Sequence, residues 1–150
     1  MRKFIISIDA GTTSNRAILF DLKGKPIFSS QKEFTQYFPK SGWVEHNPEE
    51  IWATTKKVLK DVIFKAKKLR GKVLAIGITN QRETTVLWDK KTGKTVYKAI
   101  VWQDRRQAEY CKKLKKQNKE TLIFNKTGLP IDSYFSGTKI KWILDNVSLA

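Results

Sequence analysis

The sequence predicts an α/β protein in which helices pack on a mixed β-sheet. Three short strand-like runs joined by turn residues occupy the first 34 positions. A long amphipathic helix pattern follows, and strand-like and helix-like segments then alternate along the rest of the chain. A meander of strands followed by alternating helices and strands is typical of one mixed sheet with helices packed on it.

The three N-terminal strands are expected at residues 4–8, 16–20 and 27–34. Gly11 and the Lys-Gly-Lys-Pro stretch at 23–26 provide turn residues between them. Because such short connections join neighbouring strands that run in opposite directions, these segments predict an antiparallel meander. A loop is expected at 36–46, where proline, glycine and aromatic residues interrupt any regular pattern.

A long helix is expected to begin at Asn47, which is a good N-cap residue. Pro48 suits the first helical position, and Glu50 stands three residues after the cap. Gly71 marks the end of the helical pattern. The residues predicted to face the core recur at helical spacing: Ile51, Thr55, Val58, Leu59, Val62, Ile63, Ala66 and Leu69.

The near-continuous apolar run at 73–79 predicts a central strand that is buried on both faces beneath helices. Further strands are expected at 84–88 and 99–102, and helical segments at 104–116, 122–124 and 136–144. The last helix is expected to bury one face, formed by Ile140, Ile143, Leu144 and Val147. The ribonuclease H-like, actin-like ATPase architecture is built in this way.

Composition excludes a disordered chain and a membrane-spanning one. Hydrophobic residues make up 40% of the 150 positions, which is enough for one core, and no apolar run approaches the ~20 residues of a membrane helix. The N-terminal apolar run is short and has no cleavage site after it, so we expect a cytoplasmic protein without membrane insertion. Cys111 is the only cysteine, and a small apolar core residue is favoured over a catalytic nucleophile.

The formal net charge of +16 raises the question of nucleic acid as a partner. Only six of the 30 basic residues are arginine, and the lysines are spread in small groups along the chain. Lysine lacks the planar fork with which arginine binds phosphates and bases in a bidentate way. The charge is therefore interpreted as a solvated, lysine-rich surface, and no nucleic-acid partner is expected.

Residues 9–16, between the first two predicted strands, could form a phosphate cradle. Gly11 permits a tight turn and a close approach of the backbone to a ligand. Arg16 adds compensating charge, and three hydroxyls can donate to phosphate oxygens: those of Thr12, Thr13 and Ser14. An ordinary β-turn with solvated hydroxyls is the alternative.

Asp9 ends the first predicted strand and supplies a carboxylate of the kind that Mg²⁺ takes, usually through water. The motif from Asp9 to Ser14 is similar to the first phosphate motif of carbohydrate kinases in the actin/hexokinase/Hsp70 superfamily. Four further blocks, at 39–48, 77–85, 99–106 and 134–142, resemble the glycerol kinase family in particular. Ala10 and Asn15 depart from residues common in that family (Gln and Ser), but neither change removes a charge or a phosphate hydroxyl.

The resemblance implies a substrate site made by four residues: Arg82, Glu83, Trp102 and Tyr134. The first two would bind the hydroxyls of glycerol, Trp102 would form an apolar wall, and Tyr134 would supply a further hydroxyl contact. Taken without the resemblance, the charged pair is better explained as a surface ion pair and the aromatic pair as core residues. His46 is expected to have a structural role, and Trp43 and Trp52 to be packing residues.

The resemblance further implies ATP-dependent phosphorylation of glycerol to sn-glycerol 3-phosphate, with ATP and Mg²⁺ as cofactors. Residues 1–150 would form an incomplete N-terminal lobe that binds phosphate and substrate. The base aspartate and the second lobe are expected beyond residue 150, so no catalytic residue is assigned here. The isolated chain should be inactive and bind glycerol weakly at best, and the full-length enzyme should be a homo-oligomer.

Two alternatives stay open. The first is a kinase of the same family that acts on another small polyol or sugar. The second is a ribonuclease H-like nucleic-acid-binding protein, which would need further carboxylates converging on Asp9, with Glu33, Asp89 and Asp104 as candidates.

Overall fold

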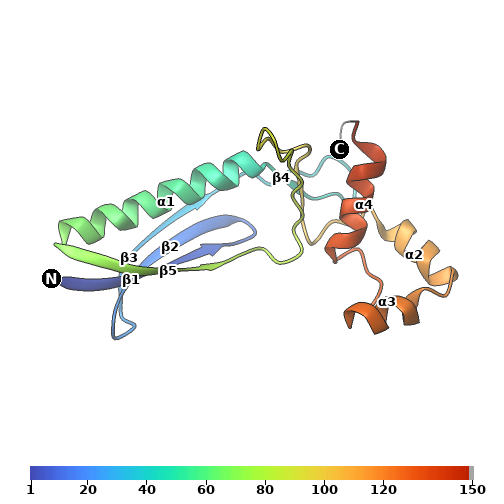
Figure 1. Ribbon diagram of the computed structural model, residues 1–150. Helices are drawn as coiled ribbons and strands as arrows, with labels where there is room; N and C mark the ends of the chain where they lie inside the picture. The colour runs from blue at the N-terminus through green and yellow to red at the C-terminus, as the bar shows by residue number, and fades with distance from the viewer. Residues whose placement is uncertain (149–150) are drawn as a thin grey trace. The chain divides into compact units, whose positions relative to one another are not determined.

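The computed structural model describes residues 1–148, which belong to two compact units. The first unit contains Met1–Thr35 and Glu49–Gln81, and the second contains Gln36–Pro48 and the residues from Arg82 onward. The segment that interrupts the first unit is the predicted loop. Figure 1 shows the helices and strands of both units.

The first unit is built on a four-stranded mixed sheet, as predicted. β1 (Arg2–Ala10), β2 (Ser14–Asp21) and β3 (Pro26–Glu33) form the expected antiparallel meander, and β5 (Gly71–Thr79) pairs with β1 in parallel. The strand order is β3-β2-β1-β5. Side chains of β1 and β2 alternate between buried and more exposed positions, which is the pattern of a sheet with one covered face.

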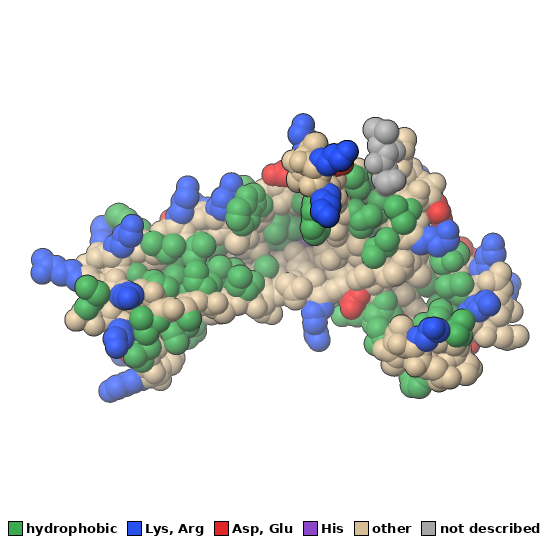
Figure 2. Space-filling model, in the orientation of Figure 1, with side chains coloured by type: hydrophobic (Ala, Val, Ile, Leu, Met, Phe, Trp, Pro, Cys, Tyr) green, Lys and Arg blue, Asp and Glu red, His purple; other side chains and the backbone are tan. Residues whose placement is uncertain are grey.

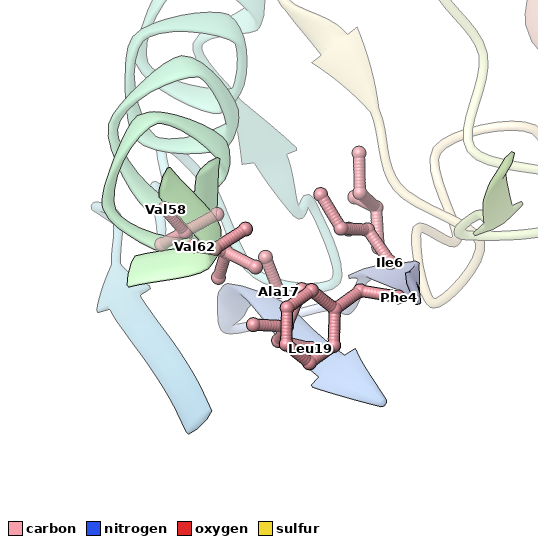
Figure 3. Close-up of a cluster of buried hydrophobic side chains, with 8 residues drawn as sticks. Phe4, Ile6, Ala17, Leu19, Val58 and Val62 are labelled. Carbon is pink, nitrogen blue, oxygen red and sulfur yellow. The ribbon is translucent and has the colours of Figure 1, made fainter. Parts of the chain in front are cut away.

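Helix α1 (Pro48–Lys68) covers this sheet, and the predicted start at Pro48 is confirmed. In Figure 1 the helix runs along the sheet, and Figure 3 shows Val58 and Val62 directed toward Ala17 and Leu19. The buried core also contains Phe4, Ile6, Ile8 and Ala66. Leu59, Ile63 and Leu69 pack partly buried against it, so most of the predicted helical face is the face that contacts the sheet.

The prediction for the apolar run at 73–79 is only half right. The strand exists, but among residues 1–148 β5 is an edge strand and not a central one, because within them it pairs on one side only, with β1. Leu74, Ile76 and Ile78 are 49%, 46% and 73% exposed. An apolar run predicts a strand that can be buried on both faces. It does not predict which elements cover those faces, or whether these elements are among the described residues.

The second unit contains a two-stranded sheet that was not expected in this form. β4 (Glu45–His46), within the predicted loop, pairs antiparallel with β6 (Ala99–Ile100). The predicted strand at 99–102 is thus reduced to two residues. The predicted strand at 84–88 is wrong, because only Thr85 and Trp88 form isolated bridges, to Ile100 and Thr95.

Three helices complete the second unit: α2 (Ala108–Lys116), α3 (Glu120–Thr127) and α4 (Ser136–Asn146). α2 starts four residues later than predicted, since residues before it form turns. α3 is longer than the predicted piece at 122–124, and it ends at Gly128 in the left-handed conformation. The predicted apolar face of α4 is confirmed at Ile143 but wrong at Ile140 and Leu144, which are exposed, and Lys139 is buried instead.

Basic side chains are scattered over the face of the molecule drawn in Figure 2 and do not gather into one patch there. This agrees with the prediction of a solvated lysine-rich surface. Within residues 1–148, no helix combines the length and the hydropathy that crossing a bilayer requires.

Candidate functional site

The first candidate site is the hairpin turn between β1 and β2, in the first unit. The backbone N–H of Gly11 donates to the carbonyl of Ser14 at 3.0 Å, which closes the turn. A Cβ on residue 11 would lie 2.9 Å from that same oxygen, so only glycine fits without a shift of the backbone. The turn therefore carries Thr12, Thr13 and Ser14 at the connection of two strands, as the phosphate-cradle prediction requires.

Arg16 is oriented by a neighbour that sequence reasoning missed. Its Nε and Nη2 atoms donate to Oε1 of Gln31 at 3.0 and 2.7 Å, and Nε2 of Gln31 donates to the Ser14 hydroxyl at 2.8 Å. Arg16 and Gln31 are directly opposite each other in the β2–β3 register. The cross-strand register of the predicted meander could have revealed this pair.

Asp9 lies opposite Arg16 in the β1–β2 register, and its side chain is exposed. Among residues 1–148 it makes no ion pair with Arg16, whose guanidinium binds Gln31 instead. The same residues contain no group of three or more His, Cys, Asp or Glu that could hold a metal ion. A single accessible carboxylate fits Mg²⁺, which in proteins is held by one or two carboxylates together with water and substrate phosphates.

The second candidate site lies in the second unit and contains Glu83. This residue has a φ of +66°, which is uncommon for a residue other than glycine. Its Oε2 atom accepts hydrogen bonds from the backbone N–H and the hydroxyl of Ser136, at 2.8 and 2.7 Å. Ser136 is the first residue of α4, where the helix dipole favours a negative charge. The N-terminus of α4 thus holds one oxygen of the carboxylate in place.

The ion pair between Arg82 and Glu83, the alternative explanation from sequence, is absent from the described part of the chain. Arg82 is exposed, and no hydrogen bond or ion pair of its guanidinium occurs within residues 1–148. The charged pair is therefore better described as one anchored carboxylate beside one accessible guanidinium.

Trp102 and Tyr134 lie in edge-to-face contact, with ring centroids 5.9 Å apart. The backbone N–H of Trp102 donates to the hydroxyl of Thr84 at 3.3 Å, which joins it to the segment that follows Glu83. Both aromatic residues are partly exposed, so neither is the core aromatic of the alternative explanation. The fold thus brings Glu83, Trp102 and Tyr134 together from three separate parts of the chain, with Arg82 adjacent.

A buried charge cluster supports the second unit, and sequence reasoning missed it. Arg106, whose side chain is fully buried, makes hydrogen bonds of 2.8–2.9 Å to the carboxylates of Asp104 and Glu45. Its guanidinium also stacks on Trp43, 3.8 Å from the ring centroid, which confirms Trp43 as a packing residue. Burial opposes the charge, but the hydrogen bonds that the guanidinium donates to Asp104 and Glu45 outweigh it and raise the pKa of Arg106.

Lys139 is a second buried cation that the sequence did not reveal. Its ammonium group donates to the carbonyls of Ser133, at 2.9 Å, of Phe135, at 3.2 Å, and of Tyr134. Burial lowers the pKa of Lys139 to about 8. No local pattern distinguishes this lysine from the many exposed ones.

The remaining predictions for single residues have mixed outcomes. Cys111 is buried, and burial raises the pKa of its thiol, which confirms a core residue and disfavours a nucleophile. His46 is fully buried, with Nε2 at 2.6 Å from Oε1 of Gln36, in agreement with a structural role. Trp52 is 58% exposed, so its prediction as a packing residue is wrong.

A cavity of about 530 Å³ adjoins Glu83 in the second unit, and residues of α2, α3, α4 and the loop between α3 and α4 give it a mainly apolar wall. Arg82, Trp102 and Tyr134 do not line it. Since these residues and Glu83 are the predicted substrate ligands, the cavity is not taken as the substrate site.

Two of the three candidate carboxylates that a ribonuclease H-like site would need have other partners. Asp104 is buried against Arg106, and Asp89 accepts the backbone N–H groups of Lys91 and Thr92 in a turn. These contacts explain both residues without a metal or a nucleic acid.

Residues 4–149 match the model of the N-terminal domain of the FGGY family of carbohydrate kinases. The chain is 60% identical over 147 residues to a glycerol kinase from Petrotoga mobilis, covering 98% of this chain and 30% of that protein. It is 61% identical over 145 residues to a glycerol kinase from Oceanobacillus iheyensis, covering 97% and 29%. The chain thus spans about 30% of the length of the curated relatives it matches.

Solved structures agree with the sequence relatives. A Plasmodium falciparum glycerol kinase with ADP is similar with a TM-score of 0.89 and 36% identity, over 97% of this chain and 29% of that one. A gluconate kinase from Lactobacillus acidophilus has a TM-score of 0.88 and 25% identity, over the same shares.

Proposed function

The chain belongs to the FGGY family of carbohydrate kinases, and from this premise we propose that it is the N-terminal part of an ATP-dependent glycerol kinase. The complete protein would be a cytoplasmic homo-oligomer of actin-like ATPase architecture, with a ribonuclease H-like core in this lobe. Its reaction would convert glycerol to sn-glycerol 3-phosphate. The observation that carries the substrate assignment is the convergence of Glu83, Trp102 and Tyr134 beside Arg82.

The geometry suits a small polyol. Ser136 holds Oε2 of Glu83, and no hydrogen bond to Oε1 occurs within the described residues, so this oxygen can accept from a substrate hydroxyl. Arg82, the other residue of the charged pair, can donate hydrogen bonds from its guanidinium to substrate oxygens. The ring of Trp102 offers an apolar surface to the carbon face, and Tyr134 carries a hydroxyl beside it.

The β1–β2 turn would bind the phosphates of ATP. The hydroxyls of Thr12, Thr13 and Ser14 and the guanidinium of Arg16 would donate to phosphate oxygens, with Gln31 holding Arg16 in place. Asp9 would hold Mg²⁺ through water. The bound Mg²⁺ would neutralise charge on the phosphates.

The reaction in the complete protein would be an in-line transfer of the γ-phosphoryl group of ATP to a terminal hydroxyl of glycerol. The residues described here would orient the hydroxyls and the phosphates, which lowers the entropic part of the barrier. The aspartate that takes the hydroxyl proton and the second lobe would be contributed from beyond residue 150. The 150-residue chain alone should therefore show no measurable kinase activity.

The test is glycerol-dependent ADP release by the complete protein, with Arg82→Ala and the exposed control Arg2→Ala. Loss of a charge-assisted hydrogen bond costs about 1.5–3 kcal/mol, which corresponds to a roughly 10- to 150-fold fall in kcat/KM for glycerol. Arg2→Ala should match the wild type. Equal kcat/KM values for Arg82→Ala and the wild type would show that Arg82 does not bind the substrate.

Another substrate is the second candidate, favoured by the similarity to a gluconate kinase and to a Lactobacillus acidophilus xylulose kinase, with a TM-score of 0.87 and 25% identity. Gluconate, xylulose and other small polyols should be assayed in parallel with glycerol. A higher kcat/KM for one of them would keep the kinase assignment and replace glycerol.

A further inference from the structure

Lys139 is buried at a place where lysine is unusual. It lies in the first turn of α4, and its side chain is among the largest fully buried ones of the described residues. Lysine is almost never fully buried unless its charge is compensated. The preceding lysine in the sequence, Lys126, and the following one, Lys141, are both exposed.

Within residues 1–148, the ammonium group of Lys139 donates hydrogen bonds to main-chain oxygens alone. Its partners are the carbonyls of three consecutive residues, Ser133, Tyr134 and Phe135, which form the segment that leads into α4. Three donors thus meet three acceptors, and no carboxylate lies within ion-pair distance of it in the described part of the chain. A buried lysine with this arrangement clamps one short stretch of backbone.

This cation stands near the N-terminus of a helix, where the helix dipole disfavours positive charge. An apolar side chain would avoid that cost and the cost of desolvation. The carboxylates of Glu83, Asp132 and Asp104 supply compensating negative potential. Glu83 is the same residue that Ser136 anchors at the start of α4, so the clamp and the carboxylate belong to one helix terminus.

We propose that Lys139 is a positioning residue of the substrate site, which holds the backbone of residues 133–135 so that Tyr134 faces Trp102 beside Glu83. The ring contact of 5.9 Å between Tyr134 and Trp102 depends on the course of this short segment. The carbonyl of Tyr134 itself is the central acceptor of the three. This inference rests on the proposed function, since it takes Tyr134 and Glu83 as substrate ligands.

The experiment compares Lys139→Met with Lys141→Met in the complete protein. Both changes remove one charge from the same helix, but Lys141 is exposed and pairs with Asp145 and the ring of Tyr110. Lys139→Met should raise the KM for glycerol at least tenfold while the KM for ATP changes less than twofold. Lys141→Met should leave both values at those of the wild type.

Two results would overturn the proposal: a glycerol KM within twofold of the wild type in Lys139→Met, or equal losses for glycerol and ATP. If Lys139→Met fails to fold, Lys139→Gln keeps an N–H donor without the charge, and it should give a smaller rise confined to glycerol. If the wild type does not phosphorylate glycerol, the proposed function fails, and a crystal structure of Lys139→Met decides the positioning role. An unchanged contact between Tyr134 and Trp102 in that structure would refute it.

Discussion

Replacement of Arg106 with methionine should destabilise the second unit strongly. Arg106 is fully buried and binds the carboxylates of Asp104 and Glu45, which are themselves 0% and 4% exposed. Methionine retains much of the volume of the side chain but leaves both carboxylates buried without their cation. Removing one partner of a buried ion pair typically costs about 3–5 kcal/mol, a large part of the stability of a small unit.

The neighbouring Arg105 provides a matched control. It also pairs with a carboxylate, that of Asp132, but the two side chains are 61% and 46% exposed. Exposed pairs are worth about 0–1 kcal/mol, so Arg105→Met should change the free energy of unfolding by no more than that. The two substituted residues are adjacent in sequence, but the expected losses in free energy of unfolding differ by several kcal/mol.

Urea unfolding of the 150-residue chain, followed by tryptophan fluorescence, measures the difference. Four of the five tryptophans belong to the second unit, and Trp43 and Trp142 lie against the guanidinium of Arg106. The reasoning would be refuted if Arg106→Met lowered the free energy of unfolding by less than about 1 kcal/mol, or by no more than Arg105→Met does. Such a result would mean that the carboxylates find water or other donors when the guanidinium is removed.

Three further predictions concern the two units. Leu19→Ala should cost about 2–5 kcal/mol in urea unfolding, because Leu19 is fully buried under α1, whereas the 57% exposed Leu22 should tolerate alanine with little loss. Gly11→Ala should weaken ATP binding by the complete protein about tenfold and leave the KM for glycerol unchanged, because the new Cβ would lie 2.9 Å from the Ser14 carbonyl oxygen. Unaltered ATP binding would argue against a phosphate-binding role of this turn. The pKa of Lys139 is about 8 in the folded protein and 10.5 ordinarily. Between pH 8 and 10.5 the unfolded chain therefore binds more protons than the folded one, so the free energy of unfolding should rise with pH over this range, by up to about 3 kcal/mol. Urea unfolding at pH 7, 9 and 10 should show this rise in the wild type and not in Lys139→Met. The groups that face Lys139 are the carboxylates of Glu83, Asp104 and Asp132 and the thiol of Cys111. Burial raises the pKa of that thiol, which lowers the free energy of unfolding as pH rises and so does not produce the same rise.

Local patterns were enough to predict the meander, the start of α1 and most of its buried face. Side-chain alternation, turn residues and the cap at Asn47 depend on neighbours within a few positions, so they can be read without the fold. The family motifs likewise marked Arg82, Glu83, Trp102 and Tyr134. In the structure Tyr134 contacts Trp102, the backbone N–H of Trp102 donates to Thr84, and Glu83 accepts from Ser136.

Other features depended on contacts between residues far apart in sequence. The edge position of β5, the pairing of β4 with β6 and the burial of Arg106 and Lys139 each require partners from another element. The clearest case is Lys139, which nothing in the neighbouring sequence distinguishes from the many exposed lysines. Its burial and its hydrogen bonds to backbone carbonyls are properties of the packed chain and leave no periodic signal in the sequence.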